Sequence, residues 1–121
     1  MTVIDLPWPV KDLHPNARPH WSVKARATKK ARSDAYFAAR ASGASWMAAD
    51  AISVAVVFSP PDKRLRDQDG MLSSVKAYLD GIADAIGVDD QKWELSIRKD
   101  EPVKNGNVRI TITPAQGTDH V

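Results

Sequence analysis

Residues 51–58 read Ala-Ile-Ser-Val-Ala-Val-Val-Phe. Large apolar side chains alternate along this stretch, so that four of them share one face: Ile52, Val54, Val56 and Phe58. A period of two in β-branched and aromatic residues is typical of a strand with one face in the core. Pro60 and Pro61 end the pattern, because proline has no N–H to donate to a sheet. The sequence predicts a half-buried strand over 51–58.

A second apolar pattern follows, at helical spacing. Over residues 70–86 the apolar side chains recur at steps of three and four, at Leu72, Val75, Leu79, Ile82 and Ile86. Such a stripe packs one face of a helix onto a core. Asp69 is suited to cap the first turn, and Gly87 to end the helix. We therefore expect one helix over 70–86.

The remaining segments complete a small mixed domain. Residues 23–42 lack glycine and proline and are rich in Ala, Lys and Arg, which predicts a helix with a thin apolar stripe that stops at Gly43. Residues 3–9 predict an edge strand, because prolines interrupt them. Two further strands are expected over 93–97 and 108–112.

The turn between the last two strands contains Asn105-Gly106, a strong hairpin signal, so we expect these strands to pair antiparallel. The whole pattern predicts an α+β domain over residues 1–121, in the order β-α-β-α-β-β. Its architecture would be a four-stranded mixed sheet with two helices on one face. Residues 10–21, between the first strand and the first helix, predict a long loop of the kind that often carries function.

Composition excludes several classes of protein. The chain of 121 residues has no cysteine, which rules out a disulfide scaffold, a cysteine-ligated metal site and a thiol nucleophile. Its longest stretch without a charge, residues 51–61, is too short to span a bilayer, and the N-terminus lacks a signal-peptide pattern. A soluble, cytoplasmic protein with no membrane partner is the expectation.

The charges are unevenly divided along the chain. Residues 1–49 hold eight basic and three acidic residues, a net charge of +5, whereas residues 50–121 hold nine basic and twelve acidic residues, a net charge of −3. A basic half can bind a polyanion such as DNA. It can equally be a solvated helix face, and both interpretations stand at this level.

An acidic motif lies between the predicted strand 51–58 and the predicted helix 70–86. Asp67 and Asp69 form a D-x-D pair, and in an extended segment two such carboxylates point the same way. Carboxylate oxygens suit Mg²⁺. The structural alternative is that Asp69 only caps the helix and that Asp67 pairs with Arg64 or Arg66. For these two residues alone, we favour that alternative.

Two more features strengthen the functional interpretation. Lys76 lies seven residues after Asp69 and returns to nearly the same helical face. Asp89 and Asp90 follow the predicted helix, in what is by default a tight turn. Carboxylates that hold a divalent ion can activate water and polarise a phosphodiester, and a nearby lysine can stabilise negative charge. The pattern is nuclease-like.

Together these segments resemble the RusA-type Holliday junction resolvases. The resemblance covers most of the chain: Leu-Pro-Trp-Pro at 6–9 followed by Asn16, the P-D-x-R-x-R-D-x-D block at 61–69, the K-A-x-x-D helix at 76–80, and the acidic turn at 87–90. There are two departures. Gly70 stands where the family often has asparagine, and Lys76 follows the second aspartate by seven residues where many members have four.

The resemblance implies a RusA-like fold and a homodimer that binds four-way DNA junctions and cuts them with Mg²⁺, for which Mn²⁺ could substitute. Carried over by position, the metal ligands would be Asp67, Asp69 and Asp90, with Asp89 as the fallback for the third. Lys76 would be the catalytic lysine. The function expected is Holliday junction resolution in DNA recombination and repair. The alternatives are a catalytically inactive branched-DNA-binding protein and a less selective flap or duplex nuclease.

Candidate DNA contacts lie in the basic half and beside the D-x-D pair. We expect DNA binding by Asn16, Arg18, His20, Lys24, Lys29, Lys30, Arg64 and Arg66. Trp21 is a candidate for a base contact, whereas Trp8 is expected to pack in the core. For His14 we favour a surface or DNA-contacting role. The cations of residues 23–42 are too scattered in sequence to predict a one-faced stripe.

Overall fold

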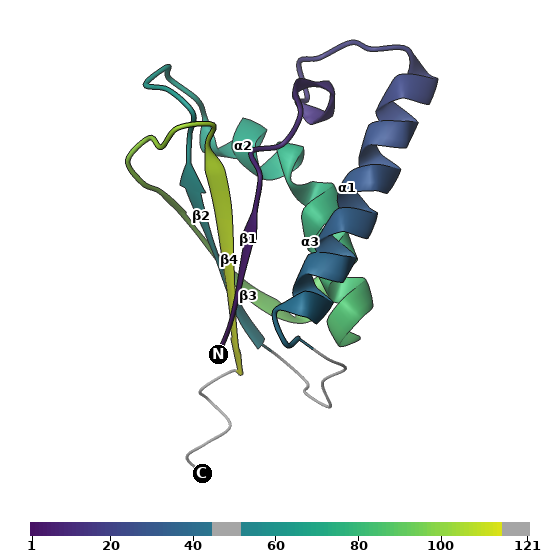
Figure 1. Cartoon of the computed structure of the whole chain (residues 1–121), viewed down its shortest axis with the longest axis vertical. Coiled ribbons are helices and arrows are strands. Elements are labelled where there is room, and N and C mark those ends of the chain that lie inside the picture. Colours follow the sequence, from purple (N-terminus) through teal and green to yellow (C-terminus); the bar gives the residue numbers. More distant parts are fainter. Residues whose placement is uncertain (45–51, 115–121) are drawn as a thin grey trace.

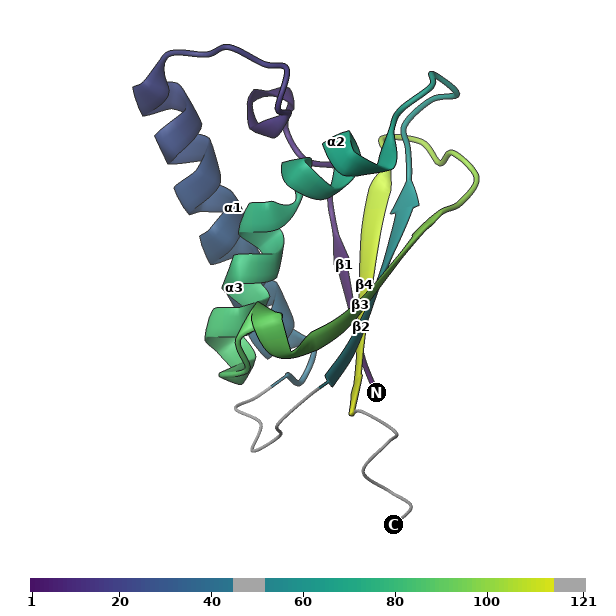
Figure 2. The same ribbon diagram turned by 180° about the vertical axis from the view of Figure 1, so that it is seen from behind.

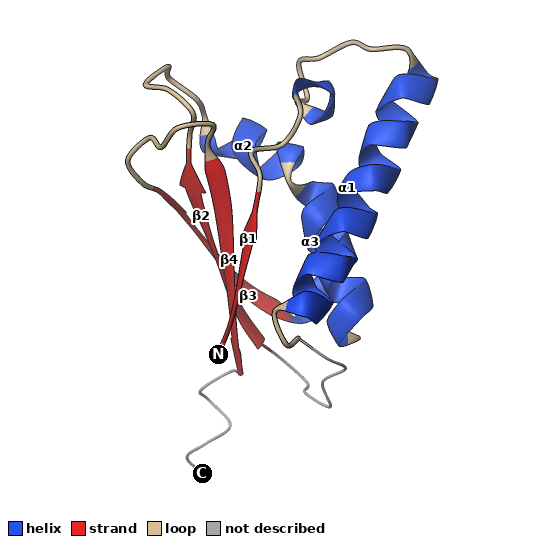
Figure 3. Cartoon of the chain, in the orientation of Figure 1, coloured by secondary structure: helices blue, strands red, loops and turns tan. Residues whose placement is uncertain are grey.

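The computed structural model describes residues 1–44 and 52–114, and their α+β class confirms the predicted one (Figures 1 and 3). The elements follow in the order β1 (Thr2–Leu6), η1 (Lys11–Leu13), α1 (Trp21–Ala41), β2 (Ile52–Ser59), α2 (Gln68–Ser74), α3 (Lys76–Ile86), η2 (Asp90–Lys92), β3 (Trp93–Lys99) and β4 (Asn107–Pro114), where η denotes a 3-10 turn. The first residue of the predicted strand 51–58 lies outside the described residues.

The four strands form one mixed sheet in the order β1-β4-β2-β3. β4 pairs antiparallel with both β1 and β2, and β2 pairs parallel with β3. The mixed, four-stranded sheet and the edge position of β1 confirm the prediction. Because β2 and β3 are parallel, the chain between them must cross back over the sheet, and α2 and α3 make that crossing.

The predicted final hairpin is wrong. Asn105 and Gly106 do form a turn, with positive φ angles of 67° and 73°, but β4 then pairs with β2 and β1 and not with β3. The segment before the turn is tied to the end of β2, because the N–H of Asp100 donates to the carbonyl of Phe58 over 2.8 Å. This segment carries the chain past β2, so that β4 enters the sheet on its other side.

Both long helices cover the same face of the sheet (Figures 1 and 2). The inward residues of β2 are at most 1% exposed, and they meet the buried stripe of α3. This stripe confirms the predicted apolar faces, although Leu72 is only partly buried. Within the described residues, no helix is long and apolar enough to cross a membrane.

The helix expected over 70–86 is interrupted at Val75. This residue (φ −106°, ψ 8°) ends α2 and precedes α3, while its side chain stays fully buried. α2 also begins before residue 70, the expected start, because Asp67, and not Asp69, is its N-cap. Lys76 therefore opens a new helix, so its seven-residue spacing from Asp69 does not by itself place the two residues on a common face.

α1 packs closely on α3 through small residues. A Cβ on Gly81 of α3 would lie 2.1 Å from the backbone carbonyl oxygen of Arg32 in α1, so only glycine fits there. The facing side of α1 is buried through Ala31, Ala35 and Ala39. The apolar stripe of α1 is thin because the helices approach so closely. α1 starts at Trp21, within the expected loop, and is capped by His20, whose ring accepts a hydrogen bond from the N–H of Ser22.

Candidate active site

Lys76 joins two acidic side chains at the start of α3. Its Nζ lies 2.6 Å from Oδ1 of Asp80, one turn further along the helix, and 2.6 Å from Oδ2 of Asp90. Asp90 reaches this position because Gly87 ends α3 in a left-handed conformation (φ 74°) and the chain then turns back. The turn that contains Asp90 thus folds toward Lys76.

The electrostatics of this cluster keep both partners ionised. Hydrogen bonds to Asp80 and then to Asp90 raise the pKa of Lys76. Its ammonium group in turn lowers the pKa of Asp90. The lysine side chain is still 58% exposed, so an incoming anion could reach it. At neutral pH Lys76 is therefore an accessible cation and not a proton acceptor.

Asp67 and Asp69 lie at the start of α2, at the end of the segment that leaves β2. Asp67 is an extended residue whose carboxylate accepts a hydrogen bond from the N–H of Gly70, which caps the helix. Asp69 lies exposed in the first turn. The structural alternative is wrong in its details, because Asp69 is not the cap and both Arg64 and Arg66 pair with Asp62 instead.

The predicted metal ligands fall into two groups. Asp67 and Asp69 belong to α2, whereas Asp90 is held by Lys76, and the fallback Asp89 caps η2 by accepting the N–H of Gln91 over 2.9 Å. Within residues 1–44 and 52–114, no three His, Asp or Glu side chains are grouped so as to hold one ion. The donor chemistry of Asp67 and Asp69 fits Mg²⁺, which proteins often bind through one or two carboxylates together with substrate phosphate. A third ligand at Asp90 stays a prediction.

His14, for which the sequence favoured a surface or DNA-contacting role, lies beside this site. Gly70 has no Cβ, and two polar groups border the place that a Cβ would take. Oδ1 of Asp67 lies 2.7 Å from that place, and Nε2 of His14 lies 3.3 Å from it. The Nδ1 atom of His14 accepts the N–H of Asn16 over 3.0 Å, which leaves the proton of a neutral ring on Nε2. No spacing in the sequence links residue 14 to residue 67, so only the fold reveals that both border this space.

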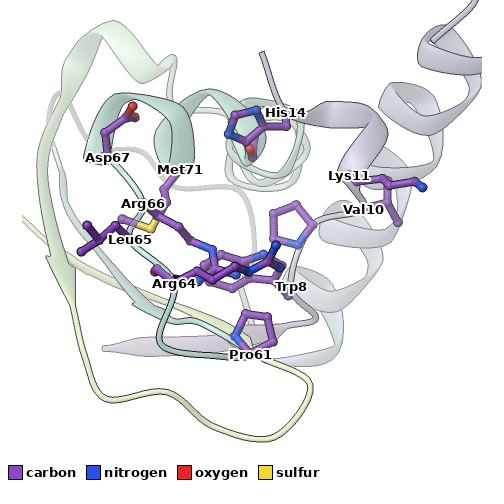
Figure 4. A pocket seen from close by; sticks show the side chains of 12 residues that line it. Trp8, Val10, Lys11, His14, Pro61, Arg64, Leu65, Arg66, Asp67 and Met71 are labelled. Atoms are coloured by element: carbon purple, nitrogen blue, oxygen red, sulfur yellow. Dashed lines mark hydrogen bonds between the residues drawn. The ribbon is translucent and has the colours of Figure 1, made fainter. Parts of the chain in front are cut away.

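A hollow of about 420 Å³ opens beside Asp67 (Figure 4). The guanidinium group of Arg66 lies 5.4 Å from the ring centroid of Trp8 and donates to the carbonyls of Asp62 and Arg64. Trp8 also meets Phe58 edge-on at 6.1 Å, as expected for a packing residue. Arg66 is thus a fixed cation, whereas Arg64 is 78% exposed. The hollow combines an aromatic wall with positive charge next to a predicted metal ligand.

The other predicted DNA contacts surround α1. Asn16, Arg18 and His20 lie exposed before the helix, and His20 is engaged in capping it. Lys24, Lys29 and Lys30 are exposed on the helix. Lys30 forms an ion pair with Asp34 over 2.6 Å, which distinguishes it from Lys29.

Comparison with known proteins finds a homologous chain. No family model matches it. It is 43% identical over 117 residues to a protein of Xylella fastidiosa strain Temecula1 that is described as uncharacterized, and the match covers 93% of this chain and 76% of that protein. The two chains belong to one family. The relative's description names no activity, so a functional assignment must come from the site itself.

Proposed function

We propose that this protein is a Mg²⁺-dependent endonuclease of the RusA type, which resolves four-way DNA junctions by paired phosphodiester cleavage in recombination and repair. The observation that carries the proposal is the contact between Lys76 and Asp90. These residues are fourteen positions apart and lie in separate elements, and the resemblance names both as catalytic. The pair leaves the side chain of Lys76 58% exposed, so that its ammonium group stays open to a DNA phosphate.

The side chains divide the work of phosphodiester cleavage between them. Asp67 and Asp69 would hold Mg²⁺, with Mn²⁺ as a substitute, and the ion would supply Lewis-acid polarisation of the phosphate. The ammonium group of Lys76 would stabilise the negative charge that develops on the phosphate oxygens, because its raised pKa keeps it protonated. Asp90 would orient that ammonium group. Arg64, beside Asp67, is exposed and able to bind a neighbouring phosphate.

Dimerisation follows from the geometry of the substrate. Resolution of a four-way junction requires cuts in two strands at symmetrical positions. One chain presents one Lys76–Asp90 pair, so two copies related by a two-fold axis would match the symmetry of the junction. We therefore include a homodimer in the proposal.

The direct test compares DNA substrates. The purified protein is incubated with Mg²⁺ and a labelled four-way junction, a flap or a linear duplex of the same arm sequence. The proposal expects cleavage of the junction at a rate at least about tenfold above that of the linear duplex. Equal rates on all three substrates would replace the resolvase with a less selective nuclease.

A second candidate is a branched-DNA-binding protein without catalytic activity. The observation that favours it is the division of the predicted ligands, with Asp90 neutralised by Lys76 and Asp67 capping α2. This candidate predicts that the junction binds but stays intact in Mg²⁺ and in Mn²⁺. The substrate comparison above separates the two candidates directly.

A further inference from the structure

One side of α1 carries a shallow groove that the proposed chemistry does not use. Its wall is formed by residues that follow one another at helical spacing: Trp21, Lys24, Ala25, Thr28, Lys29 and Arg32, which we call the α1 groove. Its volume is about 540 Å³. The sequence pattern of cations predicted no one-faced stripe. Arg26 and Lys30 do lie outside the groove, but Lys24, Lys29 and Arg32 line it together with an exposed tryptophan.

The α1 groove continues into the candidate active site. Lys24 and Thr28 also line a second hollow, whose other wall includes Ser73, Lys76 and Asp80. Arg32 likewise lines a third hollow together with Asp80 and Asp90. An anionic ligand that lies along α1 would reach the Lys76 cluster through the second hollow, because the third is lined by four aspartates: Asp80, Asp84, Asp89 and Asp90.

Charge and aromaticity indicate the class of ligand. In the described part of the chain, no ion pair engages Lys24 or Lys29, whereas Lys30 is paired with Asp34 and Arg32 with Asp84. Trp21 is 76% exposed, so its indole ring is accessible to a ligand in the groove. Free lysines beside an exposed indole ring are the elements of a surface that binds single-stranded nucleic acid, in which bases stack and the backbone is neutralised.

We infer that the α1 groove binds an unpaired DNA strand, with a base stacked on Trp21 and the backbone phosphates on Lys24 and Lys29. The inference rests on the proposed DNA substrate and specifies which part of it this surface takes. An indole face can stack only on a base that is not enclosed in a duplex. The bases of an intact four-way junction are paired, so the groove would take the strand that is freed where base pairs open at the crossover, and would guide it toward Lys76.

The first experiment measures binding of a fluorescein-labelled 15-nucleotide oligo-dT by anisotropy, in EDTA so that no cleavage occurs. Trp21→Ala should weaken binding by about 5- to 150-fold, which is the effect of losing one stacked base. Phe37→Ala is the matched control, because Phe37 is an aromatic residue of the same helix, 65% exposed and outside the groove. It should change the affinity by less than about twofold. Equal effects of the two substitutions would overturn the inference.

The second experiment tests the backbone contact with one lysine inside the groove and one outside it. Lys29→Gln should reduce the slope of log Kd against log salt by about 0.7, the value for one phosphate contact on a single strand. Lys104→Gln should leave the slope unchanged, because Lys104 is exposed in the turn before β4 and lies outside the α1 groove. Identical slopes for both variants would contradict the proposed path. Polyglutamate of equal charge that competes as well as the oligonucleotide would also overturn it, since only charge would then matter.

The outcomes separate this inference from the proposed nuclease. Oligo-dT binding that depends on Trp21, in a preparation that cuts no junction with Mg²⁺, would support the groove and contradict the nuclease. Junction cleavage without any effect of Trp21→Ala on binding would contradict the groove alone. A duplex that binds with the same dependence on Trp21 would overturn the requirement for an unpaired strand.

Discussion

Gly70 shows how one missing side chain can shape a site. The resemblance leads one to expect asparagine here, but the volume of its Cβ is taken by the carboxylate of Asp67 and the ring of His14. Both groups are the far ends of side chains, so each could move aside without disturbing the backbone. The absence of a side chain at position 70 therefore matters more for the position of the Asp67 carboxylate than for the stability of the fold.

Gly70→Ala is expected to displace the Asp67 carboxylate. Cleavage of a four-way junction should fall by about 100-fold, the usual effect of misplacing a reacting group by about 1 Å. The melting temperature should change by less than about 4 °C, because alanine is a good helix former and only flexible groups must shift. Unchanged cleavage kinetics in a folded variant would show that the position of Asp67 does not matter to the reaction.

At the level of elements, Gly81 gives the opposite case. Its missing Cβ is matched to the backbone of Arg32 in α1, which cannot move aside alone. Gly81→Ala should force α1 and α3 apart and lower the free energy of unfolding by about 1–3 kcal/mol, the typical effect of overpacking. Chemical denaturation measures this directly. A variant as stable as the wild type would mean that the two helices are not in such close contact.

The main elements could be predicted because their patterns are local. Alternation in β2 and the three-four stripe of α3 each report burial of one face, and both were found where expected. The break at Val75 could not be predicted, since the apolar stripe continues through it and the side chain is buried in either case. The predicted final hairpin is wrong because an Asn-Gly signal indicates where the chain turns, and not which strand the next strand pairs with. β2 has two edges to fill, and β4 pairs with one of them.

The candidate site was predictable to a smaller extent. The resemblance named Lys76 and Asp90, and the fold brings them within 2.6 Å of one another. The resemblance did not predict that His14 borders the site, nor that Asp62 pairs with both Arg64 and Arg66. These contacts depend on where the long N-terminal loop and the 61–67 segment pack, which no periodicity encodes.

In the molecule as a whole, ion pairs join the basic half of the sequence to the acidic half. Arg32 pairs with Asp84 over 2.6 Å and holds α1 to α3, while Arg109 pairs with Asp5 over 2.9 Å and links β4 to β1. The side-chain hydrogen bond from arginine is the largest cause that lowers the pKa of each aspartate. All four side chains are partly exposed, so each pair is screened by solvent.

The pH dependence of stability follows from these pairs. Because the folded pKa lies below the unfolded value of about 3.9, the unfolded chain binds more protons near that pH and stability increases with pH there. The contribution is complete above about pH 5 and is lost as the pH falls through the unfolded and then the folded pKa. Thermal unfolding should therefore show a lower melting temperature at about pH 2.5 than at about pH 6.

Asp84→Asn tests the origin of this dependence, since it removes the charge that pairs with Arg32. The difference in melting temperature between this variant and the wild type should be largest near neutral pH and should shrink in acid. A difference that is the same at both ends of the pH range would exclude the Asp84 carboxylate as a source of the effect.

Asp67→Asn provides the most direct test of the proposed nuclease. Asparagine caps helices as well as aspartate does, so the fold should be retained while the negative charge is lost. Initial rates of four-way junction cleavage are measured with Mg²⁺ for the wild type and the variant, with melting temperatures as the control for folding. We expect cleavage by the wild type and a loss of at least about 100-fold in the variant. Equal rates for the two proteins, or no cleavage by the folded wild type, would contradict it.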